Sequence, residues 1–161
     1  MSKVKNAEYK CKNVEYKCID GVVHVIYGTI IPTYVEEIAD MYEGKIDNRI
    51  GINFPMSIVT KYKGKGVDNI KNFKEGKYVV VYKKGDKLTK EHELMHAKYY
   101  MDDEYKRRVN DMWCSMRESS KVKIIEMLKK MGYPEDKEEI LIDEFQAYYY
   151  TEKKNFFGKN L

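Results

Sequence analysis

The N-terminal part of the chain contains two short segments of strand-forming residues that predict a pair of β-strands. Residues 14–19 and 22–27 are rich in Val, Ile and Tyr, and the dipeptide Asp20-Gly21 between them suits a tight two-residue turn. The tetrapeptide Glu-Tyr-Lys-Cys occurs at residues 8–11 and again at residues 15–18. Two copies do not make a repeat architecture, so we interpret them as neighbouring strands.

The spacing of hydrophobic residues then becomes that of a helix, and after the helix it again becomes that of β-strands. A helix is predicted from Pro32-Thr33 to about Tyr42, because proline favours the first turn and apolar residues recur every three or four positions. Its apolar side comprises Val35, Ile38 and Met41 or Tyr42. Further strands are predicted at about residues 49–54 and 77–82, separated by a loop rich in Lys and Gly.

The next segment has the periodicity of two helices. In the first helix, one face is predicted to point toward the core. Its residues, at helical spacing, are Leu88, His92, Met95 and Tyr99. The pair Asp102-Asp103 marks a break, after which a second helix is predicted to end near Glu118.

Two further helices complete the chain. Ser119 or Ser120 is predicted to cap the first of them, whose apolar face comprises Val122, Ile125 and Leu128. Gly132-Tyr133-Pro134 closes that helix, and Pro134 starts the last one, which is predicted to end near Lys153. A small sheet with one helix, followed by a helical half without a separating linker, predicts an α+β fold over residues 1–161 as a single domain.

Composition narrows the class of protein. The chain has 161 residues, of which 43% are hydrophobic, enough for a packed core and too many for a disordered chain. No apolar run approaches the length of a membrane span, and the polar N-terminus lacks the apolar core of a secretory signal. Three cysteines, an odd number, do not suit a closed disulfide framework. We therefore expect a cytoplasmic protein without a membrane partner.

Charge adds little to this picture. The net charge of +4 is spread along the chain, and its densest basic stretch spans residues 61–77. Such a stretch can bind an anionic partner such as nucleic acid, or it can be a solvated loop. We favour the solvated loop, so a nucleic-acid partner is not expected.

The segment His92-Glu93-Leu94-Met95-His96 carries the strongest chemical signal. An α-helix advances about 100° per residue, so His92 and His96 lie one turn apart on the same face and can bind one Zn²⁺. Glu93 is adjacent to the first ligand, where it can accept a proton from a water that zinc has acidified. The alternative is a buried helix face with two histidines and no metal.

A catalytic zinc site needs a third protein ligand. His24 lies far upstream and no histidine follows His96, so a carboxylate is expected. Among the carboxylates that follow the motif, Glu144 differs in having only apolar or aromatic helical neighbours. They are Ile140, Leu141, Ala147 and Tyr148. A buried carboxylate is costly unless a cation meets it, and that cation is either zinc or a lysine from another helix.

Other residues near the motif have weaker claims to the site. Asp143 is a second candidate ligand, or it orients a ligand histidine from outside the ligand set. Cys114 follows the motif on a helix and can in principle close the site. A closed structural site normally uses cysteines, whereas an open fourth position beside a glutamate favours catalysis.

The motif followed 48 positions later by Glu144, within Asp143-Glu144-Phe145-Gln146-Ala147-Tyr148, resembles the gluzincin branch of the zinc metallopeptidases. The resemblance covers residues 78–150 and implies a small zincin-like domain with His92, His96 and Glu144 as zinc ligands and Glu93 as the base. Two departures are visible. Lys90 and Lys98 replace uncharged residues beside the motif, and Tyr148 stands where some members have an aspartate that supports a ligand histidine.

The sequence therefore predicts a zinc metallopeptidase, more an endopeptidase than an exopeptidase, that acts on a peptide or protein. A tyrosine hydroxyl after the third ligand is expected to stabilise the oxyanion, with Tyr148 preferred over Tyr149 and Tyr150. The substrate is expected to add as a strand along an exposed sheet edge. The competing hypotheses are a basic binding protein with structural zinc or none, and a regulatory peptidase with one cellular target.

Overall fold

The computed structural model describes residues 13–152 and 156–158 of the chain. The described residues form two compact units that divide between Glu93 and Leu94, inside a single helix. The N-terminal unit contains a four-stranded sheet, and the C-terminal unit is helical. The predicted α+β fold is confirmed, while the prediction that the whole chain forms one domain stays a prediction.

The predicted hairpin is present as β1 (Val14–Ile19) and β2 (Val22–Tyr27), which pair antiparallel with Ile19 opposite Val22. Asp20 and Gly21 have φ angles of 50° and 80°, the two positive values that a tight hairpin turn of this length favours. The earlier copy of the tetrapeptide, residues 8–11, lies outside the described residues.

The sheet is mixed, with the order β1-β2-β4-β3. Its other strands are β3 (Ile52–Pro55), which pairs antiparallel with β4 (Tyr78–Lys83), and β4 in turn runs parallel to β2. The strand predicted at residues 49–54 is shorter than expected at its start. The Arg49 side chain instead donates to Asp40 at 2.5 Å and to the carbonyl of Gly44 at 2.7 Å, which holds the preceding loop against the end of the first helix.

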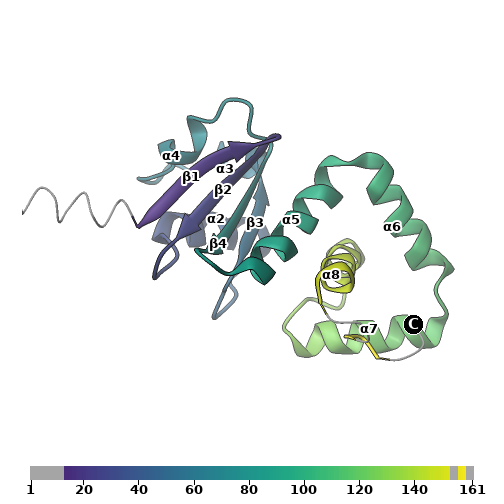
Figure 1. Ribbon diagram of the computed structural model, residues 1–161. Helices are drawn as coiled ribbons and strands as arrows, with labels where there is room; N and C mark the ends of the chain where they lie inside the picture. The colour runs from purple at the N-terminus through teal and green to yellow at the C-terminus, as the bar shows by residue number, and fades with distance from the viewer. Residues whose placement is uncertain (1–12, 153–155, 159–161) are drawn as a thin grey trace, which may run out of the picture. The chain divides into compact units, whose positions relative to one another are not determined.

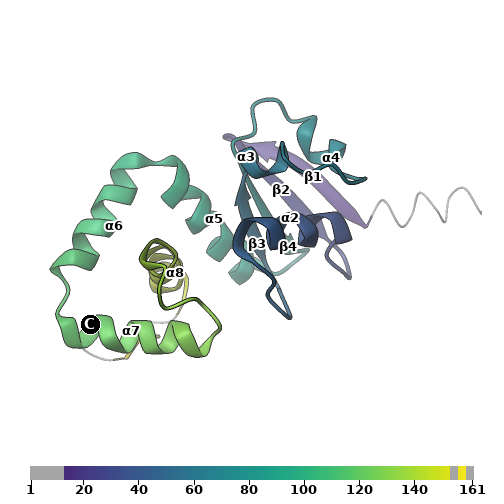
Figure 2. The same ribbon diagram turned by 180° about the vertical axis from the view of Figure 1, so that it is seen from behind.

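One face of the sheet is covered by α2 (Thr33–Glu43), α3 (Met56–Val59) and α4 (Asp68–Lys71), which Figure 2 shows in front of the strands. Val35 and Ile38 are fully buried there, as predicted, but Met41 and Tyr42 are 49% and 44% exposed. The buried residues of α2 all lie in its first two turns, so its last turn extends beyond the packed face.

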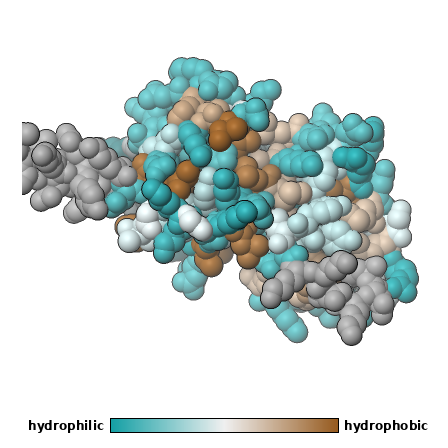
Figure 3. All heavy atoms as spheres, viewed as in Figure 1, coloured by the Kyte–Doolittle hydropathy of each residue, from teal (hydrophilic) through white to brown (hydrophobic). Residues whose placement is uncertain are grey.

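The basic segment at residues 61–77 is not a plain loop. It contains α4, which Val67 and Ile70 anchor by burying their side chains in the core of the N-terminal unit. Its lysines remain at the surface, where Figure 3 shows hydrophilic residues over the top of this unit.

The helices that follow β4 have the predicted order, and the C-terminal unit begins within the first of them. They are α5 (Lys87–Met101), α6 (Asp103–Ser115), α7 (Glu118–Lys130) and α8 (Glu138–Thr151). In Figure 1, α8 is seen end-on with α6 and α7 on two sides of it. Its core contains aromatic and aliphatic side chains from all four helices, among them Tyr99, Trp113, Leu128 and Phe145.

Several local predictions for these helices are wrong. Leu88 and Val122 are 48% and 47% exposed, so neither belongs to an inward stripe. The cap of α7 is Arg117 without a side-chain hydrogen bond, and Ser120 is buried one turn into the helix. Helix α8 starts at Glu138, four residues after Pro134. Among the described helices, none combines the length and apolar character that a membrane span requires.

Candidate metal centre on helices α5 and α8

Helix α5 follows β4 after a short turn at residues 84–86, so the motif lies close to the end of a strand in the sequence. Asp86 precedes the helix and accepts from the backbone N–H of Thr89 at 3.1 Å and from its hydroxyl at 2.6 Å. This is the hydrogen bonding of a helix N-cap, and it fixes where the first turn starts. His92 and His96 then follow one turn apart on the same side of α5.

Glu144 on α8 meets these histidines. One ligand atom from each of His92, His96 and Glu144 lies within 4.8 Å of the other two. His96 Nε2 and Glu144 Oε1 are 3.3 Å apart. Two ligand atoms of a tetrahedral zinc site with bonds of about 2.0–2.1 Å are also about 3.3 Å apart, so the spacing fits a zinc ion. The three predicted ligands are thus brought together.

The other ring nitrogen of His96 is held by Asp143. Its Nδ1 lies 2.8 Å from Asp143 Oδ1, which leaves Nε2 facing Glu144. This is the arrangement by which a carboxylate outside the ligand set fixes the tautomer and orientation of a ligand histidine. Of the two roles considered for Asp143, the geometry matches the orienting role. Asp143, the residue before Glu144, is thus the carboxylate that orients His96.

A fully buried glutamine keeps Asp143 in place. The Gln146 side chain donates to Asp143 Oδ1 at 3.0 Å and to the carbonyl of Met95 at 3.1 Å, and it accepts from the Tyr105 hydroxyl at 2.7 Å. Every polar group of this amide side chain is therefore engaged, as burial requires. The network ties α8 to α6 and to the second half of α5.

The electrostatics of His96 favour positive charge at this point. Burial by itself lowers the pKa of His96, but the charges and hydrogen bonds of Asp143 and Glu144 outweigh it and raise the pKa well above its usual value. A proton on the ring and a metal ion at Nε2 are two ways to supply that positive charge. The first makes the cluster a structural ion pair, and the second makes it a metal centre.

Glu144 is buried, as predicted, and a tyrosine that the sequence did not single out hydrogen-bonds to it. The Tyr133 side chain bonds to the Glu144 carboxylate, and its hydroxyl lies 3.1 Å from that of Tyr148. Burial, followed by the charge of Glu144, raises the pKa of Tyr133, so the hydroxyl stays protonated and donates to the carboxylate. Tyr148 itself stacks on Phe156 with a ring separation of 5.1 Å.

Glu93 is buried on α5 at 5% exposure and is held from the sheet. Its Oε1 accepts from the side-chain amide of Asn53 at 2.8 Å, and the Tyr78 hydroxyl donates to the carbonyl oxygen of the same amide. The sequence did not identify Asn53 or Tyr78 as part of this hydrogen-bond chain, because only the folding of the sheet brings them together with Glu93.

The remaining candidates lie elsewhere. Cys114 is exposed on α6 and is not part of the metal-binding cluster among the described residues. His24 is buried in β2, where its Nδ1 lies 2.8 Å from the Tyr82 hydroxyl. Lys90 and Lys98, the two charged residues beside the motif, place their ammonium groups over the rings of Tyr82 and Tyr105, at 5.8 and 4.5 Å from the centroids.

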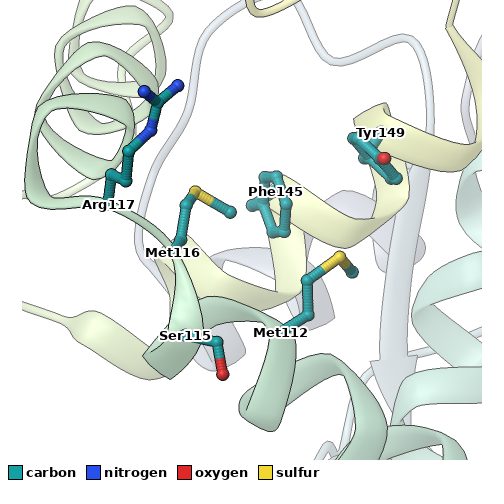
Figure 4. Close-up of a pocket in the computed structure, with 6 residues that line it drawn as sticks. All are labelled: Met112, Ser115, Met116, Arg117, Phe145 and Tyr149. Atoms are coloured by element: carbon teal, nitrogen blue, oxygen red, sulfur yellow. The ribbon is translucent and has the colours of Figure 1, made fainter. Parts of the chain in front are cut away.

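A pocket of about 290 Å³ lies in the C-terminal unit, away from these ligands. Six residues line it, and Figure 4 shows them as sticks: Met112, Ser115, Met116, Arg117, Phe145 and Tyr149. Phe145 and Tyr149 lie one turn apart on a side of α8 that is rotated about 100° from Glu144 and Tyr148. The pocket lining therefore includes Tyr149, an alternative candidate for the oxyanion donor, but not Glu93, Tyr148 or any of the three predicted ligands.

Comparisons with models of protein families, with curated proteins and with solved structures found no match for this chain.

Proposed function

We propose that this protein is a zinc-dependent peptidase whose metal is held by His92, His96 and Glu144. The observation that carries the proposal is the convergence of the two histidines and the glutamate on one point, with His96 oriented by Asp143. Two histidines and one carboxylate are a ligand set of catalytic zinc, and they leave a position for water or substrate. A closed structural site would be expected to use cysteines instead.

Zinc in this site would supply a Lewis acid that acidifies water and polarises a peptide carbonyl. The chain's own residues would do the rest. Glu93 would accept the proton of the attacking water and pass it to the leaving amine. Asp143, itself held by Gln146, orients the imidazole of His96, and Tyr133 holds the carboxylate of Glu144. Tyr148 is proposed as the donor to the developing oxyanion.

The substrate is proposed to be a peptide or protein cleaved within its chain, and the protein is proposed to act in the cytoplasm. The sheet ends in β1 on one side and β3 on the other, so both edges have backbone groups that can pair with an extended peptide. Cleavage within a chain requires no group that recognises a terminal amine or carboxylate.

The proposed base is tested by Glu93→Gln. The amide keeps the size of the side chain but cannot accept the proton, so peptide cleavage should fall by about 100-fold or more while bound zinc is unchanged. The matched control is Glu91→Gln, which changes an exposed glutamate on the same helix and should leave both quantities unchanged. Cleavage at the wild-type rate by Glu93→Gln would contradict the mechanism. Bound zinc without any cleavage by the wild type would support a structural site instead.

A further inference from the structure

The strand β3 contributes a side chain that fixes the orientation of Glu93. Ile52 and Phe54 point into the core of the N-terminal unit, so Asn53 between them points to the opposite face of the sheet. Asn53 Nδ2 lies 2.8 Å from Glu93 Oε1. The Tyr78 hydroxyl, from the neighbouring strand, donates to Asn53 Oδ1.

The chemistry of these three groups requires an amide in the middle. An ionised carboxylate only accepts hydrogen bonds, so the NH₂ group of Asn53 must face Glu93 and its carbonyl must face Tyr78. An aspartate at this position would place a second negative charge 2.8 Å from the first. A leucine has a similar shape but no donor or acceptor for either partner.

The other carboxylate oxygen lies against the backbone of Gly51. A Cβ at this position would be 2.4 Å from Glu93 Oε2 and 2.6 Å from Thr89 Cγ2, closer than side chains pack. Glycine at position 51 therefore provides the space for the carboxylate, and Asn53 binds its other oxygen. The two oxygens of Glu93 thus have their places set by two residues of one segment, Gly51 and Asn53.

We propose that Asn53 is a positioning residue for the proton transfer by Glu93, and that Gly51 makes room for the same carboxylate. The inference rests on the proposed function, since Glu93 has a proton to accept only in that reaction. A general base must be held within hydrogen-bonding reach of its proton, and a misplacement of about 1 Å can cost about 100-fold in rate.

The test compares three variants with two matched controls. Asn53→Ala removes the donor, Asn53→Asp replaces it with a like charge, and Gly51→Ala displaces the carboxylate without touching its chemistry. Each should lower kcat by about 10- to 100-fold, with Asn53→Asp the most severe, while KM and bound zinc stay within about twofold. Asn69→Ala and Asn69→Asp change an exposed asparagine of α4 and should leave kcat unchanged.

A thermal-melt cycle tests the contact without activity. Asn53→Ala, Glu93→Ala and the double variant should give melting temperatures that depart from additivity by about 3 °C, because each single change removes the same interaction. Additive shifts would overturn the inference, as would wild-type kcat in Asn53→Ala when Glu93→Gln is inactive. The latter result would leave the proposed function intact. A wild-type protein without zinc-dependent cleavage would overturn both.

Discussion

At the scale of single residues, the hydroxyl of Tyr133 links two groups of the site that lie on α8. It donates to the carboxylate of Glu144 and lies beside the hydroxyl of Tyr148. The sequence favoured Tyr148 because it follows the third ligand on the same helix. Tyr133 gave no such signal, since it lies in the turn after α7 and comes close to Glu144 only through helix packing.

The two tyrosines should have separable roles. Tyr133→Phe removes the donor to a ligand carboxylate and should weaken zinc binding by about 10- to 100-fold. Tyr148→Phe should keep zinc and lower kcat by about 100-fold, since it removes the proposed oxyanion donor. A zinc titration and a cleavage assay on both variants decide the matter. Unchanged zinc affinity in Tyr133→Phe, or unchanged kcat in Tyr148→Phe, would refute the corresponding role.

The lowered pKa of His24 should make the free energy of unfolding depend on pH. Burial, with Lys17 and Lys90 nearby, lowers the pKa of His24 to about 4, whereas the unfolded chain binds this proton near pH 6.5. Between these values the unfolded state binds more protons, so the free energy of unfolding falls as the pH falls, by up to about 3 kcal/mol.

The measurement is a series of denaturant melts from pH 7 to pH 4 on the wild type and on His24→Gln, at equal metal content. The variant has no proton to bind at this position, so its stability should fall less steeply over that window. Identical slopes for the two proteins would show that His24 does not carry this dependence.

At the scale of helices and strands, the sequence predicted which helices and strands are present more accurately than the residues at which they begin and end. The strands at residues 22–27 and 78–82 are long apolar runs that only a buried strand explains, and both were placed correctly. The start of α8 was misplaced because proline also occurs in turns, and here Pro134 lies in the turn that precedes the helix. The stripe on α5 was misjudged at Leu88, which lies in the exposed first turn.

The caps of α6 and α7 give a paired test. Asp102 accepts a hydrogen bond from the backbone N–H of Tyr105 at 3.0 Å, so Asp102→Ala should lower the free energy of unfolding by about 1 kcal/mol. Ser119, which the sequence offered as a cap of α7, does not cap it, so Ser119→Ala should change stability by less than about 0.5 kcal/mol. Chemical denaturation measures both values. An equal loss from the two substitutions would contradict these cap assignments.

At the scale of the whole molecule, the candidate metal-binding cluster joins residues that are far apart in the sequence. The burial of Glu144 was predicted from its apolar neighbours on the same helix, and the side chain is buried in the structure. Asn53 and Gly51 could not be predicted as neighbours of Glu93, nor Tyr78 as the partner of Asn53, because these contacts depend on how the strands pair and pack rather than on local pattern. The division of the chain within α5 was likewise invisible, since one continuous helix carries the boundary.

The most direct test of this account is the zinc content of the purified protein, measured beside Glu144→Ala and Glu126→Ala. The wild type should contain about one zinc per chain, and Glu144→Ala should lose zinc affinity by more than about 100-fold because two histidines alone hold zinc weakly. Glu126→Ala, which changes an exposed glutamate on α7, should bind zinc like the wild type. A folded wild-type protein that binds no zinc, or a Glu144→Ala variant with wild-type zinc affinity, would contradict the proposed metal centre.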